Sequence, residues 1–168
     1  MDMRMVIIRP ASAGDFAAIW EIFHEIIVAG DTYVNDETFT ADQARQMWLG
    51  SAVTTFVACD GERVVGAYKL TPNYPGRGAH VVNGSYIIDA SYRGRGIGRL
   101  LVEHSLQKAA SAGYKAIQFN FVVSTNYGAV KLYEDLGFHT LATLPKAFNH
   151  KTLGFVDAYL MYRSLENT

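Results

Sequence analysis

Three glycines at alternate positions, Gly94, Gly96 and Gly98, separate two segments with opposite hydrophobic patterns. Residues 79–89 have the composition of a strand, whereas residues 97–112 have helical spacing. Glycine at this density destabilises both a helix and a strand. Its advantage at the junction is therefore a backbone without side chains, which a ligand can approach closely. Free backbone N–H groups and the helix dipole converge at such a junction. The stretch therefore predicts a strand-to-helix turn that binds an anion, most often a phosphate.

Three phosphate-binding patterns compete for this loop. A Walker-type loop requires Gly-Lys-Ser/Thr, but the sequence continues Gly98-Arg99-Leu100. The dinucleotide fingerprint requires a glycine where Arg99 stands and an acidic residue roughly 20 positions downstream, where the sequence reads "GYKAIQF". The pattern Arg/Gln-x-x-Gly-x-Gly/Ala is satisfied in full by residues 93–98.

A second motif, "NYGAVKLYEDLGF", occupies residues 126–138. It contains Asn126, Ala129 and Tyr133 at helical spacing and ends in Gly-Phe. Asn126 and Tyr133 are about two helical turns apart, so they lie on one face and roughly 10 Å apart along the axis. The small Ala129 between them leaves room for a ligand. Taken alone, the stretch is better explained as a helix that packs Leu132 and Leu136 into a core.

Together the two motifs resemble the acyl-CoA loop and the following helix of the GNAT superfamily of N-acetyltransferases. The resemblance is specific over about residues 80–138, and the N-terminal half agrees only in the order of its elements. It implies that backbone amides of the glycine loop hold the pyrophosphate of acetyl-CoA. The residues it assigns to this co-substrate are Ile87, Ile88, Asp89, Arg93, Gly94, Arg95, Gly96, Ile97, Gly98, Asn126, Ala129 and Tyr133.

The same resemblance implies a reaction in which an amine attacks a thioester lying between the splayed strands "SYIID" and "AIQFN". Backbone N–H groups of residues 87–89 then hold the carbonyl, and Tyr133 is the candidate acid because a phenol with a pKa near 10 is neutral at pH 7. The base stays open between His80, Asp89 and ordered water. Alternation sends His80 and Asp89 to opposite faces of the strand, and Asp89 is also consistent with a loop carboxylate paired to an arginine.

Two asparagines, Asn83 and Asn120, interrupt otherwise apolar strands. The stretches "HVVN", "FNFVVSTN" and "GFVDA" resemble fungal acetyltransferases that act on proline analogues such as azetidine-2-carboxylate. That resemblance implies that both amides contact the substrate and that Asn126 stabilises the reacting centre. This sequence differs from the subgroup at Tyr133, where the subgroup has tryptophan. Two mechanisms therefore remain open: one in which Tyr133 is the acid, and one that relies on Asn126 at the reacting centre. The alternative is that the amides are hydrogen-bonded within the core. Tyr33, in a polar loop with aromatic residues, is expected to close the acceptor pocket.

The remaining segments predict an α/β (α+β) protein with the GNAT fold: a central mixed, mostly antiparallel sheet flanked by helices, with a splayed central strand pair, in one domain over residues 1–168. The expected strands are residues 5–12, 53–60, 62–70, 79–89, 114–123, 138–144 and 154–165, and the expected helices are residues 15–28, 40–48, 97–112 and 126–136.

Composition restricts the class of protein. The net charge of −1 argues against a nucleic-acid partner, which needs a basic face. The single cysteine, Cys59, excludes an internal disulfide and a cysteine-rich metal site, and its apolar strand predicts a buried thiol. No apolar run approaches the roughly 20 residues of a membrane span, and the N-terminal stretch does not resemble a signal peptide. We therefore expect a cytoplasmic protein without metal or membrane association.

The sequence thus predicts an N-acetyltransferase that uses acetyl-CoA, with the amine of a small amino or imino acid as the favoured acceptor. Alternatives are a protein acetyltransferase, an aminoglycoside or polyamine acetyltransferase, and a non-catalytic acyl-CoA-binding module. A polycationic acceptor requires an acidic funnel, for which "NDE" (residues 35–37) is the one candidate cluster. A homodimer is expected from the family, and the apolar last strand is compatible with it.

Overall fold

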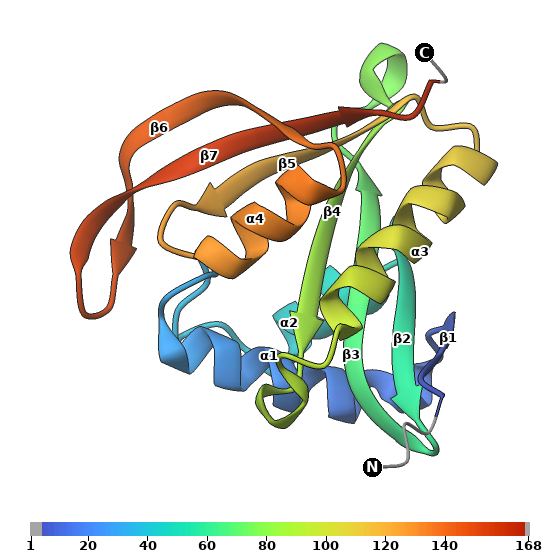
Figure 1. The fold of residues 1–168 in the computed structure, drawn as a ribbon. Helices are drawn as coiled ribbons and strands as arrows, with labels where there is room; N and C mark the ends of the chain where they lie inside the picture. Colours follow the sequence, from blue (N-terminus) through green and yellow to red (C-terminus); the bar gives the residue numbers. More distant parts are fainter. Residues whose placement is uncertain (1–4, 167–168) are drawn as a thin grey trace.

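The computed structural model describes residues 5–166, and it contains a seven-stranded sheet with helices on both faces (Figure 1). The strand order is β1-β2-β3-β4-β5-β7-β6, and every neighbouring pair is antiparallel except the parallel pair β4 and β5. This confirms the mixed, mostly antiparallel sheet. The elements are β1 (Ile7–Pro10), α1 (Phe16–Ala29), α2 (Ala41–Leu49), β2 (Thr54–Asp60), β3 (Arg63–Pro72), β4 (Val81–Ile88), α3 (Ile97–Ser111), β5 (Ala116–Val123), α4 (Tyr127–Asp135), β6 (His139–His150) and β7 (Gly154–Ser164), with short 3-10 helices at Ala13–Asp15, Gly76–Gly78 and Ala90–Tyr92.

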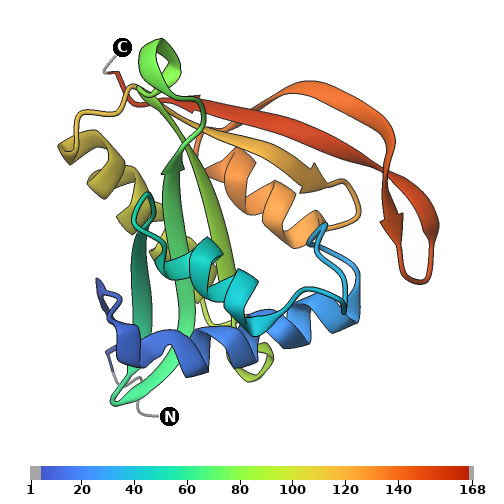
Figure 2. The same ribbon diagram turned by 180° about the vertical axis from the view of Figure 1, so that it is seen from behind.

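The helices form two layers on opposite faces of the sheet. α3 and α4 cover the face seen in Figure 1, and α1 and α2 cover the face seen in Figure 2. Alternate strand residues supply the two cores, as the period-two side-chain pattern requires. Tyr68 and Ile117 pack against Leu101 of α3, whereas Ala67 and Ile87 pack with the aromatic residues of α1 and α2. Cys59 is buried in the second core, as predicted, and burial raises the pKa of its thiol.

The central strands β4 and β5 are paired along only part of their length. Residues 81–83 pair with residues 116–118, and beyond this point β5 turns away from β4 and remains paired with β7 (Figure 1). The predicted splayed strand pair is therefore confirmed. We call the space between β4 residues 84–88 and the departing β5 the gap.

One strand is longer than predicted. The sequence indicates an end at Leu144, before Pro145, but β6 continues to His150. β6 lies at the edge of the sheet, where proline is tolerated because no further strand needs its N–H. Register shifts flank Pro145 and Lys146, and Lys146 has a φ of 50°, so a bulge absorbs the irregular residues.

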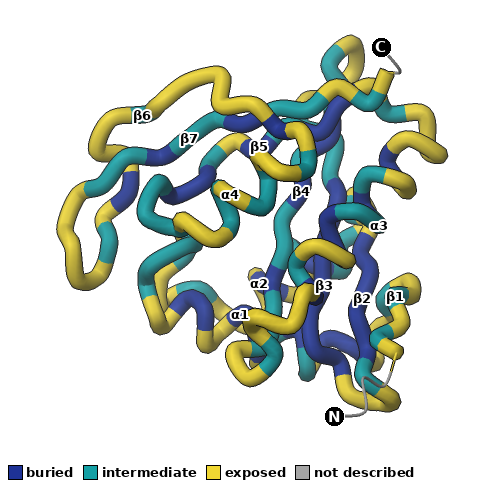
Figure 3. Tube along the Cα trace, viewed as in Figure 1, coloured by how far each residue is buried: buried dark blue, intermediate teal, exposed yellow. Residues whose placement is uncertain are grey.

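The long β6–β7 hairpin extends beyond the rest of the sheet, and its edge strand β6 is largely exposed (Figures 1 and 3). Its tip touches the end of α1. The backbone N–H of Lys151 donates to Gly30 O at 2.9 Å, and its ammonium donates to Val28 O at 2.8 Å. The tip thus supports the α1–α2 loop, which carries Tyr33. Within residues 5–166 no helix combines the length and apolar character needed to cross a bilayer.

Candidate active site

The glycine loop has the backbone that an anion site needs. Gly94 and Gly96 have φ angles of 74° and 80°, in the left-handed region, and a Cβ at either position would meet open space. Gly96 is the N-cap of α3, and the first intrahelical hydrogen bond runs from Leu100 N to Gly96 O at 3.2 Å. The N–H groups of residues 97–99 therefore have no helical partner and point out of the N-terminus. These unpaired N–H groups can donate hydrogen bonds to a phosphate.

The loop also carries free cations. Arg93 and Arg95 are exposed, and neither forms an ion pair with another residue in the range 5–166. The Arg95 guanidinium lies 4.6 Å from the centroid of the Tyr92 ring, which restricts it without neutralising it. By contrast, Arg99 is paired with two carboxylates. Gly98 packs closely, since a Cβ there would lie 3.2 Å from Ile88 Cδ1. Its small size lets the first turn of α3 approach β4.

The edge of β4 exposes backbone groups to the gap. Asp89 N donates to Val65 O at 2.9 Å, and Ile87 pairs with Ala67, so these two residues direct their backbone groups toward β3. The intervening Tyr86 and Ile88 direct theirs to the other side, where β5 has left. Of the predicted residues 87–89, Ile88 is thus the one with a backbone N–H facing the gap.

Asp89 is occupied by the turn that follows β4. Its carboxylate accepts hydrogen bonds from Arg63 at 2.7 Å and from Ser91 N at 2.9 Å. Burial raises the pKa of Asp89, but Ser91 and Arg63 outweigh burial and hold it below the ordinary value. This is the arginine-paired loop carboxylate that the sequence offered as an alternative to a base.

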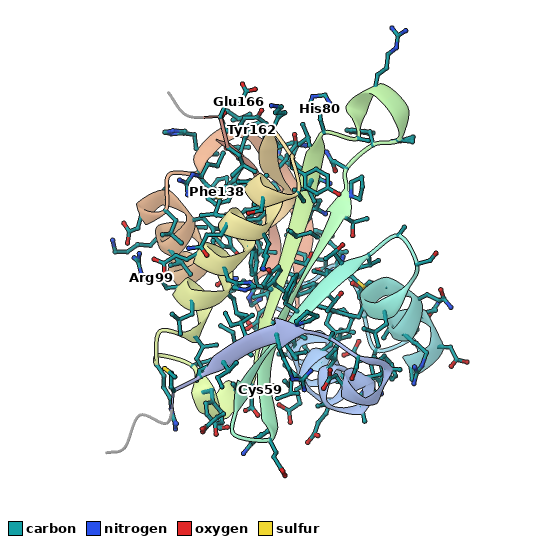
Figure 4. All side chains as sticks on the ribbon, turned by 90° about the vertical axis from the view of Figure 1, so that its right-hand side faces the viewer. Cys59, His80, Arg99, Phe138, Tyr162 and Glu166 are labelled. Atoms are coloured by element: carbon teal, nitrogen blue, oxygen red, sulfur yellow. The ribbon has the colours of Figure 1, made fainter. Side chains whose placement is uncertain are left out.

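His80 lies at the opposite end of β4 from the gap. Figure 4 shows it near Glu166 and Tyr162, whereas Cys59 lies at the other end of the sheet. The His80 carbonyl accepts from Lys115 N where β4 and β5 are still paired. Its ring is therefore distant from any group held in the gap, which leaves water as the remaining candidate base.

Tyr133 comes to the gap from α4. Its ring centroid lies 4.5 Å from that of Phe119 on β5 and 6.1 Å from that of Tyr86 on β4. The hydroxyl makes no hydrogen bond to any residue between 5 and 166, and burial raises the pKa of the phenol. The group therefore stays protonated at neutral pH and has a hydrogen available to donate.

Asn126 occupies the N-cap position of α4, but its side chain makes no capping hydrogen bond. Asparagine usually caps through its side-chain oxygen, so this amide is left available for another partner. Ala129 follows within the first turn and is half-buried. The hydroxyl of Thr125 is buried without a partner among the described residues, a feature that nothing in the motif predicted.

On the α1 and α2 face, the predicted acceptor residues belong to a polar stripe across three strands. Asn83 of β4 pairs in register with Gln118 of β5 and with Thr71 of β3. The exposed Asn120 accepts a hydrogen bond from Gln118 Nε2 at 2.9 Å and donates one to Asn73 Oδ1 at 2.6 Å. The amide chain thus links Asn120 to Gln118 and Asn73, while Asn83 lies beside Gln118 on the neighbouring strand. The sequence did not predict a role for Asn73.

Tyr33 reaches this stripe from the α1–α2 loop. Its hydroxyl donates to Tyr86 O at 3.1 Å, on the side of β4 that faces the gap. Its ring packs edge-on against Phe23, with centroids 5.1 Å apart, and burial raises the pKa of the phenol. Tyr33 and Tyr133 thus approach the gap from opposite faces of the sheet. Two surface hollows of about 340 and 570 Å³ lie beside α2 and α1, and of the predicted site residues they touch Asp89 alone.

Comparison with known proteins agrees with this geometry. The profile of the Acetyltransferase (GNAT) family matches residues 17–138. A GCN5-related N-acetyltransferase from Kribbella flavida is 43% identical with a TM-score of 0.90, over 95% of this chain and 97% of that chain. N-acetyltransferase aca1 from Schizosaccharomyces pombe is 31% identical over 151 residues, which are 80% of this chain and 72% of aca1. The fold and site define an acyltransferase.

The chain belongs to the acetyltransferase (GNAT) family. Both the superfamily resemblance and the likeness to a fungal N-acetyltransferase are confirmed. L-amino acid N-acyltransferase MnaT from Escherichia coli is 26% identical over 144 residues, which are 83% of each chain. The structure of yncA from Salmonella typhimurium, solved with acetyl-CoA, is 25% identical with a TM-score of 0.82, over 97% of this chain and 95% of that chain.

Proposed function

We propose that this enzyme transfers the acetyl group of acetyl-CoA to the amine of a small amino or imino acid, by direct attack while both substrates are bound. The observation that carries the proposal is the gap itself. A free strand edge in the middle of the sheet is bordered on one face by an anion-binding loop and on the other by a stripe of amide side chains.

The co-substrate fits the residues on the α3 and α4 face. Gly94 and Gly96 leave an open cradle before the unpaired amides of residues 97–99, and Arg93 and Arg95 supply positive charge for a pyrophosphate. The yncA structure with acetyl-CoA supports the same choice of ligand. The bound thioester supplies an activated acetyl group. We propose no resident metal.

The residues around the gap suit acetyl transfer by geometry. The Ile88 N–H faces the gap and can donate to the thioester carbonyl oxygen, where negative charge develops as the amine attacks. The Tyr133 hydroxyl, which has no hydrogen-bond partner within residues 5–166, can protonate the departing thiolate. Asn126, whose amide is not used as a helix cap, can donate to the same centre. The amine proton leaves to solvent water in this proposal.

The acceptor side favours a small polar molecule. Asn83 and Asn120 lie on the face covered by α1 and α2, and Tyr33 limits the space beside them. The relative MnaT is an L-amino acid N-acyltransferase, which supports an amino acid as acceptor. We further propose a homodimer, since the protruding hairpin exposes Leu141 and Phe155 at 59% and 68%. Sedimentation equilibrium tests the dimer, and a Phe155→Asp variant that is monomeric would locate its interface.

The decisive experiment measures thiol release from acetyl-CoA with a panel of amines. Small amino and imino acids are expected to give turnover that needs both substrates, whereas an aminoglycoside, a polyamine and a lysine peptide are not. Acetyl-CoA binding measured calorimetrically without turnover on any amine would favour the non-catalytic acyl-CoA-binding module. Faster turnover on a peptide or a polycation would replace the proposed acceptor.

A further inference from the structure

One buried cation of the sheet has no counter-charge. Lys69 of β3 is 7% exposed, yet its ammonium forms no ion pair or hydrogen bond with any residue described. Its one polar contact is with the face of the Trp48 ring, at 5.8 Å from the centroid. That distance is near the limit of a cation–π interaction, and the ammonium has no hydrogen-bond acceptor among residues 5–166. Burial without a partner lowers the pKa of Lys69, because it disfavours the charged form.

Lys69 is the first of three donors in a row. Lys69 and Thr71 alternate along β3, and Asn73 follows its last residue with its N–H still bonded to Val81 O of β4, so the three lie on one face of the sheet. The Thr71 hydroxyl and the Asn73 Nδ2 are both buried and without a partner in residues 5–166. Buried donors are almost always paired, so these two unpaired donors beside the Lys69 ammonium point to a missing acceptor group.

This donor row lies beside the gap, on the acceptor face. Lys69 is directly opposite Ser85 in β4, and Thr71 is opposite Asn83. Neighbouring strands are about 4.8 Å apart, so an extended lysine side chain can cross from β3 over β4 to its open edge. The Tyr33 hydroxyl already lies at that edge, on Tyr86 O. A small molecule anchored over β3 and β4 thus has its other end at the thioester position.

The missing group has to be an anion that only accepts hydrogen bonds. A carboxylate has this chemistry, with two oxygens and about four acceptor sites. The phosphates of acetyl-CoA are not candidates, because their proposed cradle is on the opposite face, at the N-terminus of α3. In a small amino acid the carboxylate and the amine are separated by one carbon, which matches an anchor next to the gap.

We propose that Lys69 binds the carboxylate of the acceptor, with the Thr71 hydroxyl as a second donor, and so selects amino acids over amines that lack an acid group. This inference rests on the proposed function, since it names the group by which the acceptor is recognised. It makes Lys69 a specificity-determining residue.

The test compares an amino acid with its amide as acceptors for the wild type, Lys69→Met, Thr71→Val and Lys115→Met. Lys115 is an exposed lysine at the far end of β5, paired with Glu166, and serves as the control. Lys69→Met is expected to raise KM for the acid by roughly ten- to a hundredfold and to leave KM for the amide and kcat unchanged. Thr71→Val should act in the same direction by about three- to tenfold, and Lys115→Met should match the wild type. Methionine fills a similar volume without a charge, so the variant should fold.

A second measurement does not depend on turnover. Calorimetric titration of the amino acid into the CoA-saturated protein should show binding to the wild type that Lys69→Met weakens by a similar factor. Equal binding to both proteins, or no binding to the wild type, overturns the inference. So does a variant that keeps its preference for the acid or that loses kcat equally on acid and amide. If the wild type binds the acid through Lys69 but acetylates neither compound, the proposed function fails while the anion site stands.

Discussion

The two faces of the gap are built in different ways. On the α3 and α4 face, the groups proposed to hold acetyl-CoA come from two continuous stretches, residues 93–98 and 126–133. On the α1 and α2 face, the groups proposed to hold the acceptor come from β3, β4, β5 and the loop containing Tyr33. The first half of the site consists of local features that two sequence motifs specify. The second half exists only where alternate side chains of separate strands meet.

The largest expected effect is a fall in kcat when the proposed acid in the gap, Tyr133, is replaced. Tyr133→Phe should lower kcat by ~10²–10⁴, the range for a positioned acid, and leave KM for acetyl-CoA nearly unchanged. Tyr68→Phe is the matched control, because Tyr68 packs in the same core but its hydroxyl bonds His104 at 2.7 Å. Steady-state kinetics with thiol detection measures both. If Tyr133→Phe keeps most of its turnover, the proton comes from water or the role passes to Asn126.

The next effect is confined to the co-substrate face. Gly96→Val places a side chain where the pyrophosphate approaches, and the loss of one or two charge-assisted hydrogen bonds corresponds to ~10–100-fold weaker CoA binding. Gly113→Val introduces the same backbone strain, since Gly96 and Gly113 have φ angles of 80° and 88° with open space around both. Calorimetry with CoA separates strain from blockage. Equal CoA binding by the two folded variants would argue that the loop does not hold CoA.

A smaller effect is expected on the acceptor face. Asn120→Ala removes an exposed amide that bonds Asn73 and Gln118, and we expect KM for the acceptor to rise about tenfold with CoA binding intact. An amino acid amide should be a poorer acceptor than the acid. Normal kinetics with only a lower Tm would assign Asn120 a structural role in the amide chain.

The smallest effect concerns the tyrosine that joins the two halves. Tyr33→Phe removes one hydrogen bond, to Tyr86 O, and keeps the ring that packs on Phe23. We expect a loss of about 1 kcal/mol in the free energy of unfolding and a rise of about two- to fivefold in acceptor KM. Thermal unfolding and acceptor titration measure these changes. A change in CoA affinity instead would show that Tyr33 belongs to the other face.

Most helices and strands were predictable because their signals are local. Gly30 and Gly113 end α1 and α3 with φ angles of 65° and 88°, as glycines beyond helix C-termini commonly do. The exception, β6, shows the limit of such signals. Pro145 stops a strand in isolation, but an edge strand with a bulge can continue past it, and only the sheet order reveals that β6 is an edge.

The residues of the candidate site also fall into those with a local sequence signal and those that only the sheet order reveals. The sequence by itself determined the glycine loop, the Asn126–Tyr133 helix and the polar positions at Asn83 and Asn120, because spacing along one chain fixes what lies on one turn or one strand face. Only the tertiary structure decided that Ile88 rather than Ile87 faces the gap and that Asp89 is paired with Arg63. It also decided that Lys69 is buried without an ion-pair partner in the described part of the chain. These facts depend on which strands are neighbours and where one pair separates. Such long-range pairing has no signature in the local sequence.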